Sequence, residues 1–329
     1  MGMKRRYLLA IMALVVGMGL VFGGPAAAVA AGRPDAVRKD ASAGSKRITK
    51  TSKARRAKAP KAVPAEAPRD DGRLDVKSAM LMDLGTGEIL YEQAPDMQIP
   101  PASLTKILTL YLVFDAIQKG DLRPWDMVPV NERAPAAGGS NMALHPGEEV
   151  ALAELIKGIA IASANDACVA VAERLEPDIP SFVVRMNQTA FSLGMTSTIF
   201  KNPNGMPADG QLTTARDMLL LSRAYLSRFP GALAIHSMKY FSHNEIMRRN
   251  ANSLLGKYDG VDGLKTGFVN ASGFNIVATA KRGDTRLLAV VLGARSPKVR
   301  EIQTARLIDE GFRLAETHRA QGSRVVAAR

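Results

Sequence analysis

The chain has 329 residues, of which 47% are hydrophobic and 23% charged, as is usual for a globular protein of one large domain or two ordinary ones. Its net charge of +13 is concentrated at the N-terminus: residues 1–73 hold 16 Lys and Arg against 5 Asp and Glu, whereas residues 74–329 hold 28 against 26. The folded part is therefore close to neutral, which argues against a nucleic-acid-binding domain. The single cysteine, Cys168, excludes an internal disulfide and a Cys-rich zinc site.

Residues 1–31 have the organisation of a secretory signal peptide. Basic residues at positions 4–6 precede an apolar run over residues 7–22, and alternating alanines at positions 26–30 offer Ala-x-Ala cleavage sites. The apolar run is shorter than the roughly 20 residues that span a bilayer. We therefore expect cleavage and export to the periplasm or extracytoplasmic cell envelope, with retention as a membrane anchor as the alternative.

Residues 32–73 form a basic segment that is poor in large apolar side chains. Residues 33–61 contain 11 basic residues against 2 acidic ones. Because such a segment buries too little apolar surface to offset its ordering entropy, it is predicted to be a disordered linker. It could contact an anionic envelope surface electrostatically, or serve only as a solvated spacer.

The folded domain is expected over residues 74–316, followed by a C-terminal tail over 317–329. Alternating apolar residues around a Gly-rich turn predict a β-hairpin, and apolar periodicity predicts helices through the middle of the chain. The hairpin strands are expected at 78–83 and 88–92. A first helix is expected after the prolines at 100 and 101, with Ser103 in its first turn and apolar residues from 107 to 117. Further helices are expected at 152–161, 166–175, 179–193 and 214–228, late strands at 261–269, 273–280 and 286–292, and a last helix at 298–312.

Strands at both ends with helices between them predict an α/β fold of the α+β type. A single antiparallel sheet would be assembled from the two ends of the domain and flanked by helices, with a central helical cluster. Neither an internal repeat nor a second folded domain is apparent in the sequence.

Three short motifs occur in order along the domain. Ser103-x-x-Lys106 follows two prolines at the start of a predicted helix, where residues three apart share a face. Ser163-x-Asn165 lies between two helices, and residues 265–267 (Lys-Thr-Gly) lie on a predicted strand. Each motif is weak alone, but their order and placement together form a strong signal, because this trio is the signature of class A β-lactamases and penicillin-binding proteins.

With the residues that flank these motifs, the chain resembles the serine D-Ala-D-Ala carboxypeptidases, a family of low-molecular-mass penicillin-binding proteins. The resemblance implies a β-lactamase/transpeptidase-like fold. It also implies removal of the terminal D-Ala from peptidoglycan stem pentapeptides through an acyl-enzyme, with covalent inhibition by β-lactam antibiotics. No cofactor and no metal are expected.

The roles of the first two motifs follow from their chemistry. Ser103 would be the nucleophile, which needs a base, and Lys106 would be the general base. Lys106 can accept a proton only when it is neutral, and burial near Lys265 would lower its pKa. Ser163 would relay a proton to the leaving amine, and Asn165 would hydrogen-bond Lys106 or the substrate amide.

The third motif would bind the substrate's terminal carboxylate through Lys265 and Thr266, while Gly267 would let the strand approach the ligand closely. The backbone N–H groups of Ser103 and Phe268 would form the oxyanion hole. By resemblance, Arg300 and Arg249 are further candidates near the carboxylate pocket, with a surface charge as the alternative for each.

Two positions depart from the pattern of the family. Asn204 stands where some relatives carry His, and Val269 stands where many carry Thr.

Other functions use the same motifs. A DD-endopeptidase that cleaves peptidoglycan crosslinks would need the same residues and a different groove. A β-lactamase is disfavoured because no Glu precedes the third motif at an obvious position for activating water. The alternative that is not an enzyme is a non-catalytic module that binds penicillin or the cell wall.

Overall fold

The computed structural model describes residues 72–327, with side chains as far as residue 318. The predicted signal peptide over 1–31 lies outside the described residues. So does all but the last two residues of the predicted linker over 32–73. Both remain predictions.

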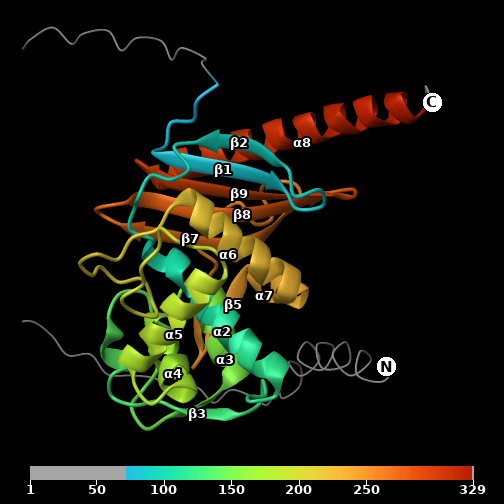
Figure 1. Cartoon of the computed structure of the whole chain (residues 1–329). Helices are drawn as coiled ribbons and strands as arrows, with labels where there is room; N and C mark the ends of the chain where they lie inside the picture. The colour runs from blue at the N-terminus through green and yellow to red at the C-terminus, as the bar shows by residue number, and fades with distance from the viewer. Residues whose placement is uncertain (1–71, 328–329) are drawn as a thin grey trace, which may run out of the picture. The chain divides into compact units, whose positions relative to one another are not determined.

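A five-stranded antiparallel sheet brings the two ends of the domain together (Figure 1). Its strand order is β2-β1-β9-β8-β7, so the N-terminal hairpin pairs with the last strand, for example through Met80 opposite Val290. The bounds are β1 Ser78–Asp83, β2 Ile89–Gln93, β7 Val261–Val269, β8 Gly273–Arg282 and β9 Thr285–Ala294. The prediction of an α+β fold with one sheet built from both termini is confirmed.

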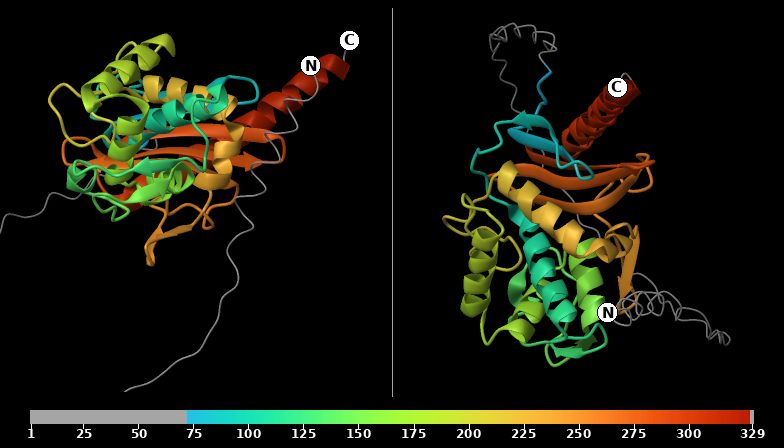
Figure 2. Two further views of the ribbon diagram at one scale, coloured as in Figure 1. Left: turned by 90° about the horizontal axis from the view of Figure 1, so that it is seen from below. Right: turned by 45° about the vertical axis from the view of Figure 1, so that its right-hand side comes forward.

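Both faces of this sheet are buried. On β9, Leu288 and Val290 face the helical cluster, whereas the alternate residues Leu287 and Val291 pack in a second core with Ile308 of the last helix. A strand that is covered on both faces has a continuous apolar sequence, as residues 287–292 have. The last helix thus covers one face and the remaining helices the other (Figure 2, right).

Three helix ends in the cluster have recognisable caps. Asp178 and Thr214 accept backbone N–H bonds at the first turns of α5 and α6, and Gly120 ends α2 in the left-handed conformation that glycine adopts easily. The bounds are α2 Lys106–Lys119, α3 Leu152–Lys157, α4 Asn165–Leu175, α5 Ile179–Ser192, α6 Ala215–Arg228, α7 Leu233–His236 and α8 Pro297–Ala327.

Short elements lie between these helices and strands. Two two-stranded ribbons and several single turns were not predicted, because strands of three or four residues give little periodic signal. They are β3 Met127–Pro129 with β4 Glu149–Ala151, β5 Tyr240–His243 with β6 Ile246–Arg249, and the turns η1 Ala102–Thr105, η2 Pro135–Ala137, η3 Gly158–Ala162 and η4 Pro230–Ala232.

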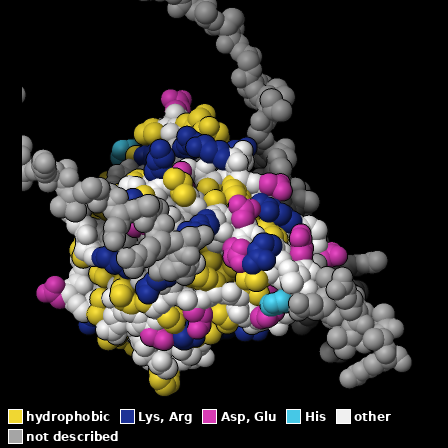
Figure 3. All heavy atoms as spheres, turned by 90° about the horizontal axis from the view of Figure 1, so that it is seen from above, with side chains coloured by type: hydrophobic (Ala, Val, Ile, Leu, Met, Phe, Trp, Pro, Cys, Tyr) yellow, Lys and Arg dark blue, Asp and Glu magenta, His cyan; other side chains and the backbone are white. Residues whose placement is uncertain are grey.

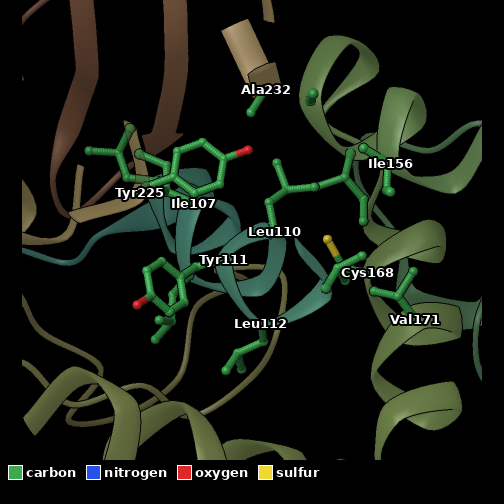
Figure 4. Close-up of a cluster of buried hydrophobic side chains, with 14 of the residues drawn as sticks. Ile107, Leu110, Tyr111, Leu112, Ile156, Cys168, Val171, Tyr225 and Ala232 are labelled. Carbon is green, nitrogen blue, oxygen red and sulfur yellow. The ribbon is translucent and has the colours of Figure 1, made fainter. Parts of the chain in front are cut away.

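Helix α2 lies at the centre of the larger core (Figure 4). Ile107, Leu110 and Leu112 point in different directions from it and are all buried, against side chains such as Ile156 of α3 and Cys168 of α4. A helix that is apolar all round is expected inside a cluster rather than on its surface. Each of these buried aliphatic side chains contributes about 1.5–3 kcal/mol through burial, which anchors α2 firmly.

Three expected helices differ from the structure. The first was expected to carry Ser103 in its first turn, but α2 begins at Lys106 and Ser103 lies in the preceding turn η1. The helix expected over residues 152–161 is α3 followed by a π-helical turn, η3, after which Ser163 adopts a left-handed conformation with φ of 58°. The last helix extends past Phe312 to Ala327, into residues assigned to the C-terminal tail. The apolar pattern ends near Phe312, but no proline follows Pro297, so nothing in the sequence stops the helix.

Positive and negative side chains lie interspersed over the face seen in Figure 3, in keeping with the near-neutral charge of the domain. Among the described residues, no helix combines the length and the apolar character that crossing a bilayer requires.

Candidate active site

The first motif lies at the junction of η1 and α2. Ser103 belongs to the tight turn η1, and Lys106 is the first residue of α2. The Lys106 Nζ donates hydrogen bonds to Ser103 Oγ at 2.9 Å and to the main-chain oxygen of Asn204 at 2.5 Å. Ser103 is partly exposed while Lys106 is fully buried, so the hydroxyl is accessible and the amine that contacts it is not.

Burial changes the protonation of Lys106. Loss of hydration lowers its pKa to about 8, against a smaller opposing influence of Cys168 and Asp166. Burial, with the nearby charges of Lys106 and Arg300, also holds the pKa of Lys265 well below its usual value. A neutral Lys106 amine is therefore present in a useful fraction near neutral pH, as a general base requires.

The second motif meets the third. Ser163 follows the π-helical turn in its left-handed conformation, and its Oγ accepts a hydrogen bond from Lys265 Nζ at 2.9 Å. The Asn165 Nδ2 donates to the main-chain oxygen of Gly138 at 2.7 Å. Asn165 was expected to hydrogen-bond either Lys106 or the substrate amide. No hydrogen bond joins Asn165 to Lys106 among the described residues, and the bond to the substrate amide stays a prediction.

The third motif lies on β7, the edge strand of the sheet (Figure 1). This strand packs against η1. Lys265 is buried with 2% of its surface exposed, and Thr266 is buried beside it. A Cβ at Gly267 would lie 3.0 Å from the Ser103 nitrogen and 3.2 Å from the Leu104 nitrogen. The strand thus approaches the turn that carries the proposed nucleophile, and Gly267 is needed for that contact.

Three candidates remain, and the structure places each in a different environment. Phe268 follows Gly267 on the edge strand; its side chain is half exposed and its ring stacks on Phe274 with 4.3 Å between the centroids. The role of its backbone N–H group in an oxyanion hole stays a prediction. Arg300 is buried with its charge close to Lys265, and its Nε has no hydrogen-bond partner among the described residues. Arg249 is exposed on β6, and it is the neighbouring Arg248 that binds Asn141.

Sequence reasoning missed contacts made by the main chain. Asn204 stood out only as a replacement for His, yet its carbonyl oxygen is the second partner of Lys106. Gly205, with φ of 80°, lies so close to Ala102 that an added Cβ would be 1.9 Å from the Ala102 oxygen. The turn-rich sequence of residues 202–205 was the available signal, but it gives no indication of what the turn touches.

A serine with a lysine at its side, a second lysine–serine pair and a neighbouring asparagine, on an antiparallel sheet flanked by helices, define the class that contains penicillin-binding proteins and β-lactamases. Within this class, the sequence pattern of the D-alanyl-D-alanine carboxypeptidase family matches residues 62–296. The chain belongs to this family.

Individual relatives agree with this assignment. The chain is 42% identical to the D-alanyl-D-alanine carboxypeptidase DacC of Escherichia coli over 266 residues, which are 79% of this chain and 66% of DacC. Penicillin binding protein 6B from Escherichia coli superposes with a TM-score of 0.71 at 38% identity, covering 76% of this chain and 81% of that one. Penicillin-binding protein D2 from Listeria monocytogenes, solved in its cefotaxime-bound form, gives 0.67 at 31% identity, covering 73% and 98%.

These comparisons also confirm the fold class expected from the three motifs. The chain spans just under two thirds of the length of DacC.

Proposed function

We propose that the protein is a serine D-Ala-D-Ala carboxypeptidase, which removes the terminal D-Ala from peptidoglycan stem pentapeptides through an acyl-enzyme. The observation that carries this proposal is the pairing of two hydroxyls with two buried lysines. Ser103 pairs with Lys106 at 2.9 Å, and Ser163 pairs with Lys265 at 2.9 Å. The relatives named as carboxypeptidases give it further support.

In the acylation step, neutral Lys106 takes the proton from Ser103 as the Oγ attacks the carbonyl carbon of the penultimate D-Ala. With a pKa of about 8, about a tenth of Lys106 is neutral at pH 7. The C–N bond then breaks, the leaving amine receives a proton relayed through Ser163, and D-Ala departs. Water attacks the resulting ester and releases the shortened peptide.

The substrate would be held by opposite charge and by hydrogen bonds. Its terminal carboxylate would bind Lys265 and Thr266, and the unpaired Nε of buried Arg300 is a further donor beside Lys265. The developing oxyanion would accept from the backbone N–H groups of Ser103 and Phe268. Losing one such donor typically costs about a hundredfold or more in rate.

The test is acylation by a labelled penicillin, since a β-lactam reacts with the same serine and remains attached. The wild-type protein should be labelled, and Ser103→Ala should abolish labelling. Release of D-Ala from a model pentapeptide should stop in the same variant and in the presence of penicillin. Labelling that survives in Ser103→Ala would refute the assignment.

The endopeptidase alternative is separated by substrate rather than by residue. Purified muropeptides should lose one alanine from monomeric pentapeptides if the proposal is correct. Separation of crosslinked dimers would instead assign the endopeptidase activity, fast turnover of a chromogenic β-lactam would assign a β-lactamase, and binding of sacculi without D-Ala release would assign a non-catalytic wall-binding module.

The proposal places the protein in the cell envelope, where its substrate is found. The signal-peptide organisation of residues 1–31 supports export, and the 11 basic residues between positions 33 and 61 support contact with an anionic envelope surface. Measuring the length of the protein recovered from cell envelopes tests the first point, since cleavage near residue 30 would remove the apolar run.

A further inference from the structure

A buried carboxylate stands next to Asn165. Asp166 is 1% exposed and lies in the first turn of α4. Its two oxygens accept backbone N–H bonds from Met142 at 3.0 Å, from Leu144 at 3.1 Å and from Ala167 at 2.9 Å. Burying a charged carboxylate costs free energy unless several hydrogen-bond donors replace the lost water. Here those donors are main-chain N–H groups.

Two of these donors belong to a loop that lies against Asn165. This loop comprises residues 138–144 (the 138–144 loop). The loop's Gly138 oxygen accepts from the Asn165 side chain, and its Ser140 oxygen accepts from the Asn165 backbone N–H at 2.7 Å. Asp166 therefore fixes one end of the loop, and Asn165 holds the other.

We propose that Asp166 is a positioning residue of the active site, which anchors the 138–144 loop and thereby holds Asn165 in place at the start of α4. The proposal deepens the carboxypeptidase function proposed above and rests on it. A buried carboxylate that accepts from two backbone N–H groups of the loop gives the loop a fixed geometry. Small displacements of positioning groups have large effects on rate.

The position of Asp166 has an electrostatic consequence that a merely structural residue would lack. Lys106 is surrounded by few titratable groups: Asp166 and Cys168 from α4, and Lys265 from β7. The turns η1 and η3, which also pack against α2, contribute none.

The charged groups of α5 and α6 that contact α2 lie farther along the helix. They are Arg185 and Arg228, and both pair with Asp115. Asp166 is thus the carboxylate whose charge favours protonated Lys106.

Asp166→Asn is the central experiment. The amide is close in size, but it carries no charge and turns a donor toward backbone N–H groups. Acylation by labelled penicillin should fall at least tenfold. Amide hydrogen exchange at Met142 and Leu144 should become at least tenfold faster, and the rise of acylation with pH should move to lower pH, because Lys106 loses a stabilising negative charge.

Asp217→Asn is the matched control. Asp217 is also buried near a helix start and accepts bonds from Ser197 N at 2.9 Å and Thr198 Oγ at 2.6 Å, but it does not influence the pKa of Lys106. This variant should lose stability without moving the pH profile or the exchange at Met142 and Leu144. An equal effect of the two variants on all three readouts would overturn the proposal.

Asp166→Glu separates the two consequences and serves if the Asn variant does not fold. It keeps the charge but displaces the carboxylate by a methylene, so exchange at Met142 and Leu144 should quicken while the pH profile stays nearer to wild type. Unchanged exchange in both Asp166 variants would overturn the anchoring role. Exchange is read without any substrate, whereas failure of the wild type to be labelled would refute the proposed function itself.

Discussion

Gly205→Ala should disable the proposed nucleophile without touching any side chain of the site. The added Cβ would lie 1.9 Å from the Ala102 oxygen, 2.4 Å from the Ala102 carbonyl carbon and 3.0 Å from the Ser103 nitrogen. All of these are main-chain atoms that cannot rotate away. Gly205 also follows Asn204, whose carbonyl oxygen accepts from Lys106.

The magnitude follows from that geometry. A carbon needs about 3.2–3.5 Å from a carbonyl oxygen, so the 202–205 turn and η1 would have to separate by more than about 1 Å. Misplacing catalytic groups by about 1 Å costs about a hundredfold in rate. Alanine at a φ of 80° adds about 1–2 kcal/mol of backbone strain on top of the clash.

The assay is the second-order rate of acylation by a fluorescent penicillin, with the melting temperature measured alongside. Gly210→Ala is the matched control: φ is 73° there, and the nearest atom to the added Cβ is the flexible Lys201 Cε at 3.7 Å. The control should carry the strain alone and keep an acylation rate near wild type. Equal rates for the two variants would refute the argument that Gly205 sets the position of Ser103.

Three further predictions concern buried titratable groups. Because burial lowers the pKa of Lys106 to about 8 and only its neutral form is a base, acylation should rise about tenfold from pH 7 to pH 9; a flat profile would contradict this. Burial lowers the pKa of His236 to about 3, so between pH 6.5 and about pH 3 the unfolded state alone binds this proton. Stability should therefore fall with acidification by up to about 1.4 kcal/mol per pH unit, a slope that denaturant titrations should find shallower in His236→Gln. Burial raises the pKa of Cys168 to about 11, so a thiol reagent should not modify it in the folded protein, and Cys168→Ala should keep its acylation rate.

Local signals in the sequence were sufficient for much of the fold. The hairpin at β1 and β2 and the strands β7 to β9 have alternating or continuous apolar runs bounded by Gly and Asn turns, and these patterns depend on neighbouring residues alone. The short ribbons β3–β4 and β5–β6 could not be predicted, because strands of three or four residues carry too little periodicity. The π-helical turn before Ser163 could not be predicted either, because its sequence, Gly-Ile-Ala-Ile-Ala, suits an ordinary α-helix equally well.

The sequence by itself determined the reactive groups of this protein: Ser103 with Lys106 one helical turn away, Ser163, and a lysine on a strand. A spacing of three residues is enough for such a pairing, since side chains three apart share a face in an α-helix and eclipse in a 3₁₀ turn such as η1, which leads directly into α2. Tertiary structure alone decided which of these groups touch and in what environment. The bond from Lys265 to Ser163 joins residues 102 positions apart, and the bond from Lys106 to the Asn204 oxygen joins residues 98 apart. Burial, which sets the protonation of Lys106, is likewise a property of the packed core and of no single stretch of the chain.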